Sequence, residues 1–230
     1  MNEVQSTNES EAPNWRPLDE MQRRVLGVLV EKAKTTPDAY PLTVNAIKTA
    51  SNQKSNRSPK MDLAADDVMA TLDELREMGA VAEIQGDGRA EKYRHLAYDW
   101  LGVDQFELAV MTELMLRGQQ TVGELRARAA RMEPIAGMSE LKPILASLKQ
   151  KRLLVELTPP GRGQTVTHGL FLEGEQPVAA VPPAATIREP AAVSGQTVKS
   201  PADGGQESAL EKRVAELERR LSELESRLTQ

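Results

Sequence analysis

The segment PLTVNAIKTASNQKSNRSPK, residues 41–60, joins a short helix pattern to a polar tail that contains no carboxylate. Apolar residues recur at helical spacing from Val44 to Ala50, and Thr43 precedes them where a helix N-cap is expected. The tail, residues 52–58, consists of amides, hydroxyls and cations, which bind phosphate well. Two interpretations are open: a phosphate-binding surface, or a solvated loop whose Asn and Ser side chains close turns.

Helix patterns flank this segment on both sides, and a hairpin pattern follows them. Asp19 and Gln22 fit a capping box at the start of a first helix. A third helix is expected from about residue 64 to 78, and Gly79 ends it. The apolar face of the first helix carries Met21, Val25, Val28 and Leu29. That of the third helix carries Val68, Leu72 and Leu75. Residues 81–96 then alternate as two strands, VAEIQ and EKYRHL, around the turn sequence GDGR.

The same order of three helices and a hairpin returns further along the chain. The motif T-V-x-x-I at 43–47 recurs as T-V-x-x-L at 121–125, and a second hairpin pattern flanks residues 159–163. The third-helix stripe recurs at a constant distance, as Leu141, Leu145 and Leu148. This self-similarity predicts two tandem winged helix-turn-helix domains, residues 17–101 and 102–172, in a mainly α chain with small β-hairpins, an α+β class.

The C-terminal residues 209–230 follow the heptad spacing of a coiled-coil helix. We expect residues 1–16 to be disordered and the Pro-, Ala- and Gly-rich residues 173–208 to form a flexible linker. The apolar seam comprises Leu210, Val214, Leu217, Leu221, Leu224 and Leu228. In a parallel pair Arg213 would face Glu218 of the second helix, whereas an antiparallel pair would oppose like charges. The pattern predicts a homodimer through a parallel coiled coil; the alternative is a single amphipathic helix that docks on its own globular part.

The composition excludes several classes of protein. The 230 residues include no cysteine and two histidines, so disulfides, thiolate catalysis and cysteine-based zinc sites are excluded. The first residues are acidic and polar, unlike a signal peptide. The longest apolar run, residues 25–30, is too short to cross a bilayer. We expect a soluble, cytoplasmic protein.

The sequence contains no recognisable catalytic constellation. His95 and His168 occupy equivalent positions of the two hairpins, which is typical of shared structural residues rather than of a catalytic pair. No glycine-rich loop follows a strand and opens a helix, as a nucleotide-binding fingerprint requires. We therefore expect a protein that is not an enzyme and that binds no cofactor and no metal.

The motifs resemble those of the YceH-type bacterial family of proteins of unassigned function. The similarity rests on PLTVNAIKTASNQKSNRSPKMDL at 41–63, on LRGQQTVGELRARAARM at 116–132 and on the closing heptads. It covers roughly residues 18–172, and it is specific because N-Q-K-S-N-R between two helices is not generic winged-helix sequence. The resemblance implies two tandem winged-helix domains and no firm activity.

Two functions of different classes remain open. The first is sequence-specific binding of double-stranded DNA by a dimer, as in a transcription regulator, because a winged helix usually places its third helix in the major groove. The candidate contacts are Lys54, Arg57, Arg126, Arg128, Arg131, Lys142, Lys149 and Arg162. The second is an adaptor that binds a protein partner, which the acidic third helix at residues 64–78 favours. The cationic stretches favour DNA by a small margin.

Overall fold

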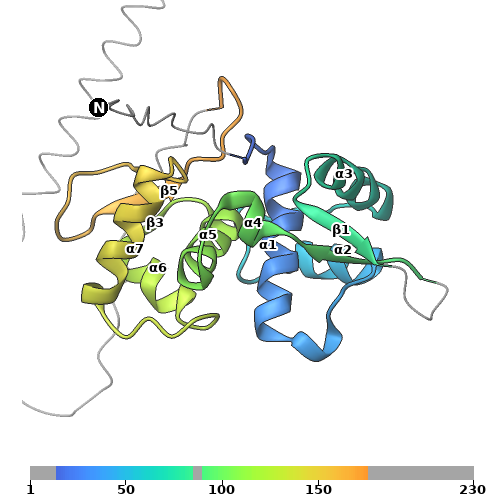
Figure 1. The fold of residues 1–230 in the computed structure, drawn as a ribbon, viewed down its shortest axis with the longest axis horizontal. Helices are drawn as coiled ribbons and strands as arrows, with labels where there is room; N and C mark the ends of the chain where they lie inside the picture. Colours follow the sequence, from blue (N-terminus) through green and yellow to red (C-terminus); the bar gives the residue numbers. More distant parts are fainter. Residues whose placement is uncertain (1–13, 85–89, 176–230) are drawn as a thin grey trace, which may run out of the picture. The chain divides into compact units, whose positions relative to one another are not determined.

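A computed structural model of the chain describes residues 14–84 and 90–175 (Figure 1). All of the described residues belong to one compact unit. The expected disordered N-terminus, the first hairpin turn, the linker and the coiled-coil helix lie wholly or largely outside the described residues, and they remain predictions.

Within the described residues the chain forms seven α-helices, one short 3-10 helix and two small antiparallel sheets, the mixed α+β class that the sequence predicts. The first half, residues 18–101, contains α1 (Glu20–Thr35), η1 (Pro37–Ala39), α2 (Val44–Ser51), α3 (Ala65–Glu77), β1 (Val81–Ile84), β2 (Lys92–His95) and α4 (Ala97–Leu101). The second half, residues 102–175, contains α5 (Gln105–Arg117), β3 (Gln120–Thr121), α6 (Val122–Ala129), α7 (Met138–Gln150), β4 (Leu154–Glu156) and β5 (Thr165–His168). Three helices followed by a hairpin therefore occur twice (Figure 1).

The first and second helices of each half begin at the caps that the sequence predicts. The Asp19 side chain accepts a hydrogen bond from Gln22 N (2.8 Å), and the Gln22 side chain accepts one from Asp19 N (3.0 Å). A second capping box starts α5 at Asp104. The hydroxyl oxygens of Thr43 and Thr121 cap α2 and α6. These caps satisfy amides that a helix leaves free at its start, which is why the helices begin there.

One backbone pairing recurs in both halves and ties the start of the second helix to the hairpin. Leu42, just before α2, forms an isolated antiparallel bridge with Tyr93 of β2. The second sheet has the order β3-β5-β4, and Gln120, just before α6, pairs with Val166 of β5. Tyr93 and Val166 are both buried, so each hairpin covers the core at an equivalent position.

The second copy is shorter than the first in two loops. Equivalent residues are 85 positions apart at the first cap (Asp19 and Asp104) and 78 apart at the second (Thr43 and Thr121). They are 73 apart throughout the third helices, where α3 and α7 correspond residue for residue. The first half therefore has seven additional residues between its first two helices and five between its second and third. The five-residue difference falls in the loop that contains the polar segment 52–58.

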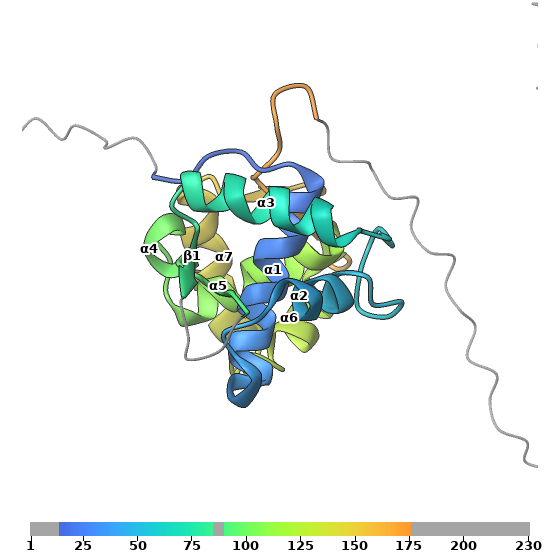
Figure 2. The same ribbon diagram turned by 90° about the vertical axis from the view of Figure 1, so that its right-hand side faces the viewer.

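Helices α1 and α5 lie side by side where the two halves meet (Figures 1 and 2). The predicted apolar face of α1 is confirmed at Val25, Val28 and Leu29, but Met21 is 40% exposed. Met21 lies in the first turn of α1, before the stretch from Gln22 to Glu31 that is buried, so its position in the apolar stripe does not bring it into the core. Gly27 marks a close approach to α5, because a Cβ atom added there would lie 3.0 Å from Cδ2 of Leu116.

Replacing Gly27 by valine is expected to lower the free energy of unfolding by about 1–3 kcal/mol, because the branched side chain overpacks the contact between α1 and α5. The same change at Gly123 of α6, where an added Cβ meets no atom within 4 Å, is expected to alter stability by at most about 0.5 kcal/mol. Urea unfolding of the two variants measures the difference. Equal losses of stability would contradict the close approach.

Candidate functional site

The polar segment 52–58 folds back onto the protein between α1 and α5. Asn52 closes the loop: its side-chain oxygen accepts from Leu63 N and its side-chain nitrogen donates to Leu63 O, both at 2.9 Å. At the other end, Ser58 N donates to Leu116 O at the C-terminal end of α5 (2.9 Å). The segment is thus fastened to both halves. Asn52 closes a turn, as the second interpretation expects, while residues 54–56 and 58 stay exposed.

Arg57 is buried inside this loop, which corrects its prediction as a phosphate contact. Its side chain is 0% exposed and pairs with Glu31 of α1, donating to Oε2 at 2.5 Å and to Oε1 at 3.2 Å. It also donates to Ala50 O at the end of α2 (3.0 Å). A guanidinium whose donors are turned inward in this way cannot reach a phosphate, so Arg57 stabilises the fold.

Arg24 of α1 holds both ends of the same loop. Its Nη1 donates to Ser51 O (3.0 Å) and its Nη2 donates to Pro59 O (2.6 Å). Burial and the nearby Arg57 lower the pKa of Arg24 to about 10, so the side chain stays charged at neutral pH. Among the described residues no carboxylate forms an ion pair with Arg24, in contrast to Arg57.

The three arginines in and after α6 that were predicted to contact DNA have partners within the second half. Arg126 donates to two backbone carbonyls of the loop before α7 (3.1 and 3.2 Å). Arg128 donates to Gln120 Oε1 (2.6 Å), and Arg131 pairs with the buried Glu113 of α5 (2.7 Å). Arg131 thereby connects the end of α6 to α5. Its side chain is nevertheless 46% exposed, and that of Arg128 is 33% exposed, so both keep part of their surface free.

The four other candidate cations are also at the surface. Lys142 and Lys149 lie seven residues apart on the exposed side of α7, and Lys149 pairs with Glu156 of β4. Lys54 and Arg162 are exposed, the latter between β4 and β5, and the described residues offer no ion-pair partner to Lys54, Lys142 or Arg162. Of the eight candidates, Arg57 is the one whose side chain the described structure buries.

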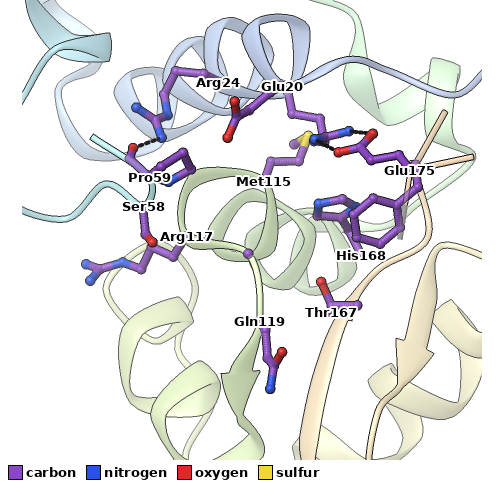
Figure 3. A pocket seen from close by; sticks show the side chains of 13 residues that line it. Glu20, Arg24, Ser58, Pro59, Met115, Arg117, Gln119, Thr167, His168 and Glu175 are labelled. Carbon is purple, nitrogen blue, oxygen red and sulfur yellow. Dashed lines mark hydrogen bonds and ion pairs between the residues drawn. The ribbon is translucent and has the colours of Figure 1, made fainter. Parts of the chain in front are cut away.

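A pocket of about 340 Å³ lies where the two halves meet (Figure 3). α1 and residues 58–59 line it from the first half, and the end of α5 and residues 167–175 line it from the second. Its charged and aromatic lining includes Glu20, Arg23, Arg24, Arg117, His168 and Phe171. Figure 3 shows Arg24 and His168 on opposite walls, with Met115 between them.

Carboxylates pair with two of the three arginines that line the pocket, and Glu113 is shared between Arg117 and Arg131. Arg23 forms a two-pronged ion pair with Glu175, with 2.9 Å between Nη1 and Oε2, and this contact lowers the pKa of Glu175. Arg117 pairs with Glu113 at 2.9 Å. The third arginine, Arg24, has backbone carbonyls as its only described partners. Arg24 therefore has no carboxylate in ion-pair contact among the described residues, although the nearby Glu20 favours its charged form.

The two histidines occupy the equivalent hairpin positions that the sequence predicts, but their surroundings differ. His95 Nδ1 accepts from Ala97 N (3.3 Å), and burial lowers the pKa of His95 to about 4. His168 stacks on Phe171 with ring centroids 4.2 Å apart and makes no hydrogen bond with any described residue. Burial, together with Arg23, lowers the pKa of His168 to about 3. Both imidazoles are therefore neutral at pH 7.

Sequence reasoning missed this pocket because its walls come from segments that lie far apart in the chain. One signal was available. Arg23 and Arg24 directly precede the apolar run 25–30, in a helix that is buried from Gln22 to Glu31. Charged residues are rare in a buried helix unless they have a partner or belong to a functional site. This pair of arginines therefore indicated that polar partners or a site lie beside the helix.

The part of the chain that the structure describes contains no group of three or more His, Asp or Glu side chains that could hold a metal ion. Its helices were also compared with the length and hydropathy that a bilayer requires. Over residues 14–84 and 90–175, none is both long and apolar enough to span a membrane.

Comparison with known proteins gives one consistent match. A family model described as "Protein of unknown function, DUF480" matches residues 18–162. A UPF0502 protein of Rhodopirellula baltica is 55% identical over 176 residues, which cover 76% of this chain and 74% of that protein. A UPF0502 protein of Geobacter sulfurreducens is 38% identical over 201 residues, which cover 86% of this chain and 89% of that protein. A UPF0502 protein of Geotalea daltonii is 44% identical over 167 residues, which cover 71% of this chain and 76% of that protein.

Replacing Arg57 by alanine is expected to lower the free energy of unfolding by about 3–5 kcal/mol, because Glu31 would remain buried without its partner. Lys54→Ala, in the same loop but exposed, is expected to change stability by less than about 0.5 kcal/mol. Chemical denaturation of the two variants provides the measurement. An Arg57→Ala variant as stable as Lys54→Ala would refute the structural role of Arg57.

Proposed function

The chain belongs to the DUF480, or UPF0502, family of bacterial proteins, as its resemblance to the YceH-type proteins predicts, and from this premise we propose that it is a non-enzymatic protein that binds double-stranded DNA through its second half. Each half is interpreted as a winged helix-turn-helix unit, with α3 or α7 as its third helix and the hairpin as its wing. The repeated order of three helices and a hairpin, and the bridge from each hairpin to the start of the second helix, support this interpretation.

The observation that carries the proposal is a difference in charge between two equivalent helices. Helix α3 carries five carboxylates and one basic residue, Arg76. The five equivalent positions of α7 are occupied by Ser139, Glu140, Ala146, Ser147 and Gln150. At the positions of Met69 and Arg76, α7 carries Lys142 and Lys149. The exposed side of α3 would repel phosphate, whereas that of α7 would attract it.

DNA contact is therefore assigned to α7 and to the loop that follows β4. Lys142 and Lys149 point from the same side of α7, and Arg162 lies in the position that a wing occupies. Lys149 pairs with Glu156 at the surface, where an exposed ion pair contributes little and can exchange for a phosphate. Three cations on one unit give modest affinity, and two units in a dimer would add their contributions.

A second candidate function has its own supporting observation. The exposed side of α3 combines its carboxylates with Met69, which is 44% exposed. An acidic surface with an apolar residue suits a basic segment of a protein partner better than it suits DNA. Under this alternative the two halves form a protein-binding adaptor without direct contact to nucleic acid.

Binding to a random-sequence duplex is expected to weaken steeply between about 50 and 200 mM salt, because cations of the protein displace counterions from phosphate. Replacing Lys142 and Lys149 together by glutamine is expected to reduce the slope of log K against log salt by about 2. Fluorescence anisotropy of a labelled duplex measures both slopes.

Arg76→Gln is the matched control, because Arg76 occupies in α3 the position of Lys149 in α7. The proposal expects this variant to bind with the slope of the unmodified protein. Absence of binding at about 50 mM salt would refute DNA binding and favour the adaptor. An equal loss in Arg76→Gln would refute the assignment to α7.

We further propose that two copies pair through residues 210–228, which lie outside the described residues, so that this proposal rests on sequence alone. The heptads place apolar residues at the seam and set Arg213 and Arg220 against Glu218 and Glu225 in a parallel pair. A parallel dimer would present two α7 helices to one duplex.

Light scattering on the unmodified chain is expected to give twice the mass of 25.2 kDa. Placing glutamate at both Leu217 and Leu224 puts like charges in the seam and is expected to give the mass of one chain. Glutamate at Ser222 and Ser226, outside the seam, adds the same charge and is expected to leave the dimer intact. A monomeric unmodified chain would refute the pairing.

A further inference from the structure

The pocket at the junction of the halves has no part in the proposed DNA binding. Its lining comes from α1, residues 58–59, the end of α5 and residues 167–175, whereas the proposed contacts to DNA lie on α7 and the loop after β4. Its volume of about 340 Å³ falls at the lower end of the range of small-molecule sites. Such a pocket suits one small ligand.

Arg24 gives this pocket a positive charge that the described residues do not balance. It donates to the carbonyls of Ser51 and Pro59, and its Nε is buried without a partner among the described residues. The carboxylate of Glu20, one turn earlier, also lines the pocket but is exposed to solvent and forms no ion pair with Arg24. A buried, unpaired charge is costly, and an anion bound beside Arg24 would remove that cost.

His168 supplies a second unused polar group on the opposite wall (Figure 3). The residue is only 4% exposed, and its Nδ1 has no hydrogen-bond partner among the described residues. A neutral imidazole can donate one hydrogen bond and accept another. Met115 lies between the two polar walls, and Phe171 stacks on the imidazole, so the space between Arg24 and His168 is partly apolar.

We propose that this pocket binds a small organic carboxylate that carries a hydroxyl group at its far end. The carboxylate pairs with Arg24, the apolar body contacts Met115 and Phe171, and the hydroxyl bonds to His168. Arg23 and Arg117 are engaged with Glu175 and Glu113 and shape the pocket rather than binding the ligand. The site stands apart from α7, so its failure would leave the proposed DNA binding untouched, and the reverse also holds.

The two histidines of the chain allow a direct test in the full-length protein, because each imidazole gives its own NMR signals. With 4-hydroxybenzoate as the probe, the His168 signals are expected to shift saturably while those of His95 stay in place. Benzoate, which lacks the hydroxyl, is expected to bind more weakly. The uncharged 4-hydroxybenzamide and inorganic phosphate are expected to leave both histidines unchanged. An equal response to 4-hydroxybenzamide, or no response of His168 to 4-hydroxybenzoate, would overturn the proposal.

Two substitutions test the role of charge. Arg24→Gln is expected to weaken binding of 4-hydroxybenzoate about tenfold or more, as loss of a buried charge partner does, with the His95 signals reporting whether the protein is folded. Glu20→Gln removes the competing carboxylate at the rim and is expected to strengthen binding about two- to fivefold. Glu77→Gln on α3 is the control, with unchanged affinity. An unchanged or weakened affinity of the Glu20→Gln variant for 4-hydroxybenzoate would overturn the assignment of an anion beside Arg24. The Glu20→Gln measurement decides this even if the Arg24→Gln variant does not fold.

Discussion

The attachment of the loop at 52–59 to α1 is the constraint on which the arrangement of the two halves depends. α1 is buried over most of its length, yet it contains charged residues, and burying a charge is tolerable only when partners surround it. Arg57 supplies the partner of Glu31, and the carbonyls at the ends of the loop accept from Arg24. Because Ser58 is also bonded to α5, these polar contacts bind the loop and both first helices into one structure.

The second half also buries a carboxylate in its first helix, and different residues neutralise it. Its buried first helix, α5, carries Glu113, which pairs with Arg117 one turn later and with Arg131 after α6. Each half thus uses arginines to neutralise a carboxylate inside its first helix. Arg57 is buried by this contact, whereas Arg131 stays 46% exposed. The two halves share the order of their helices and hairpin but not their charges, so the exposed sides of α3 and α7 differ strongly.

Local signals predicted the elements well. The caps at Asp19 and Thr43, and the apolar stripes of α3 and α7, involve residues at most four positions apart, so the helices they specify could be recognised without knowing the fold. The exposure of Lys142 also followed from its position on a helix with one apolar side. Prediction failed for Met21, because it lies in the first turn of α1, before the part of the helix that the fold buries.

The sequence by itself determined the order of the elements, the duplication and the acidic character of α3, because caps, periodicity and repeats act over short distances or by direct comparison of residues. The tertiary structure alone decided which cations are free and where a pocket opens. Arg57 and Glu31 are 26 residues apart, and Arg23 and Glu175 are 152 apart. A charge is neutralised by whatever the fold brings within a few ångströms, and that neighbour leaves no trace in the sequence around it.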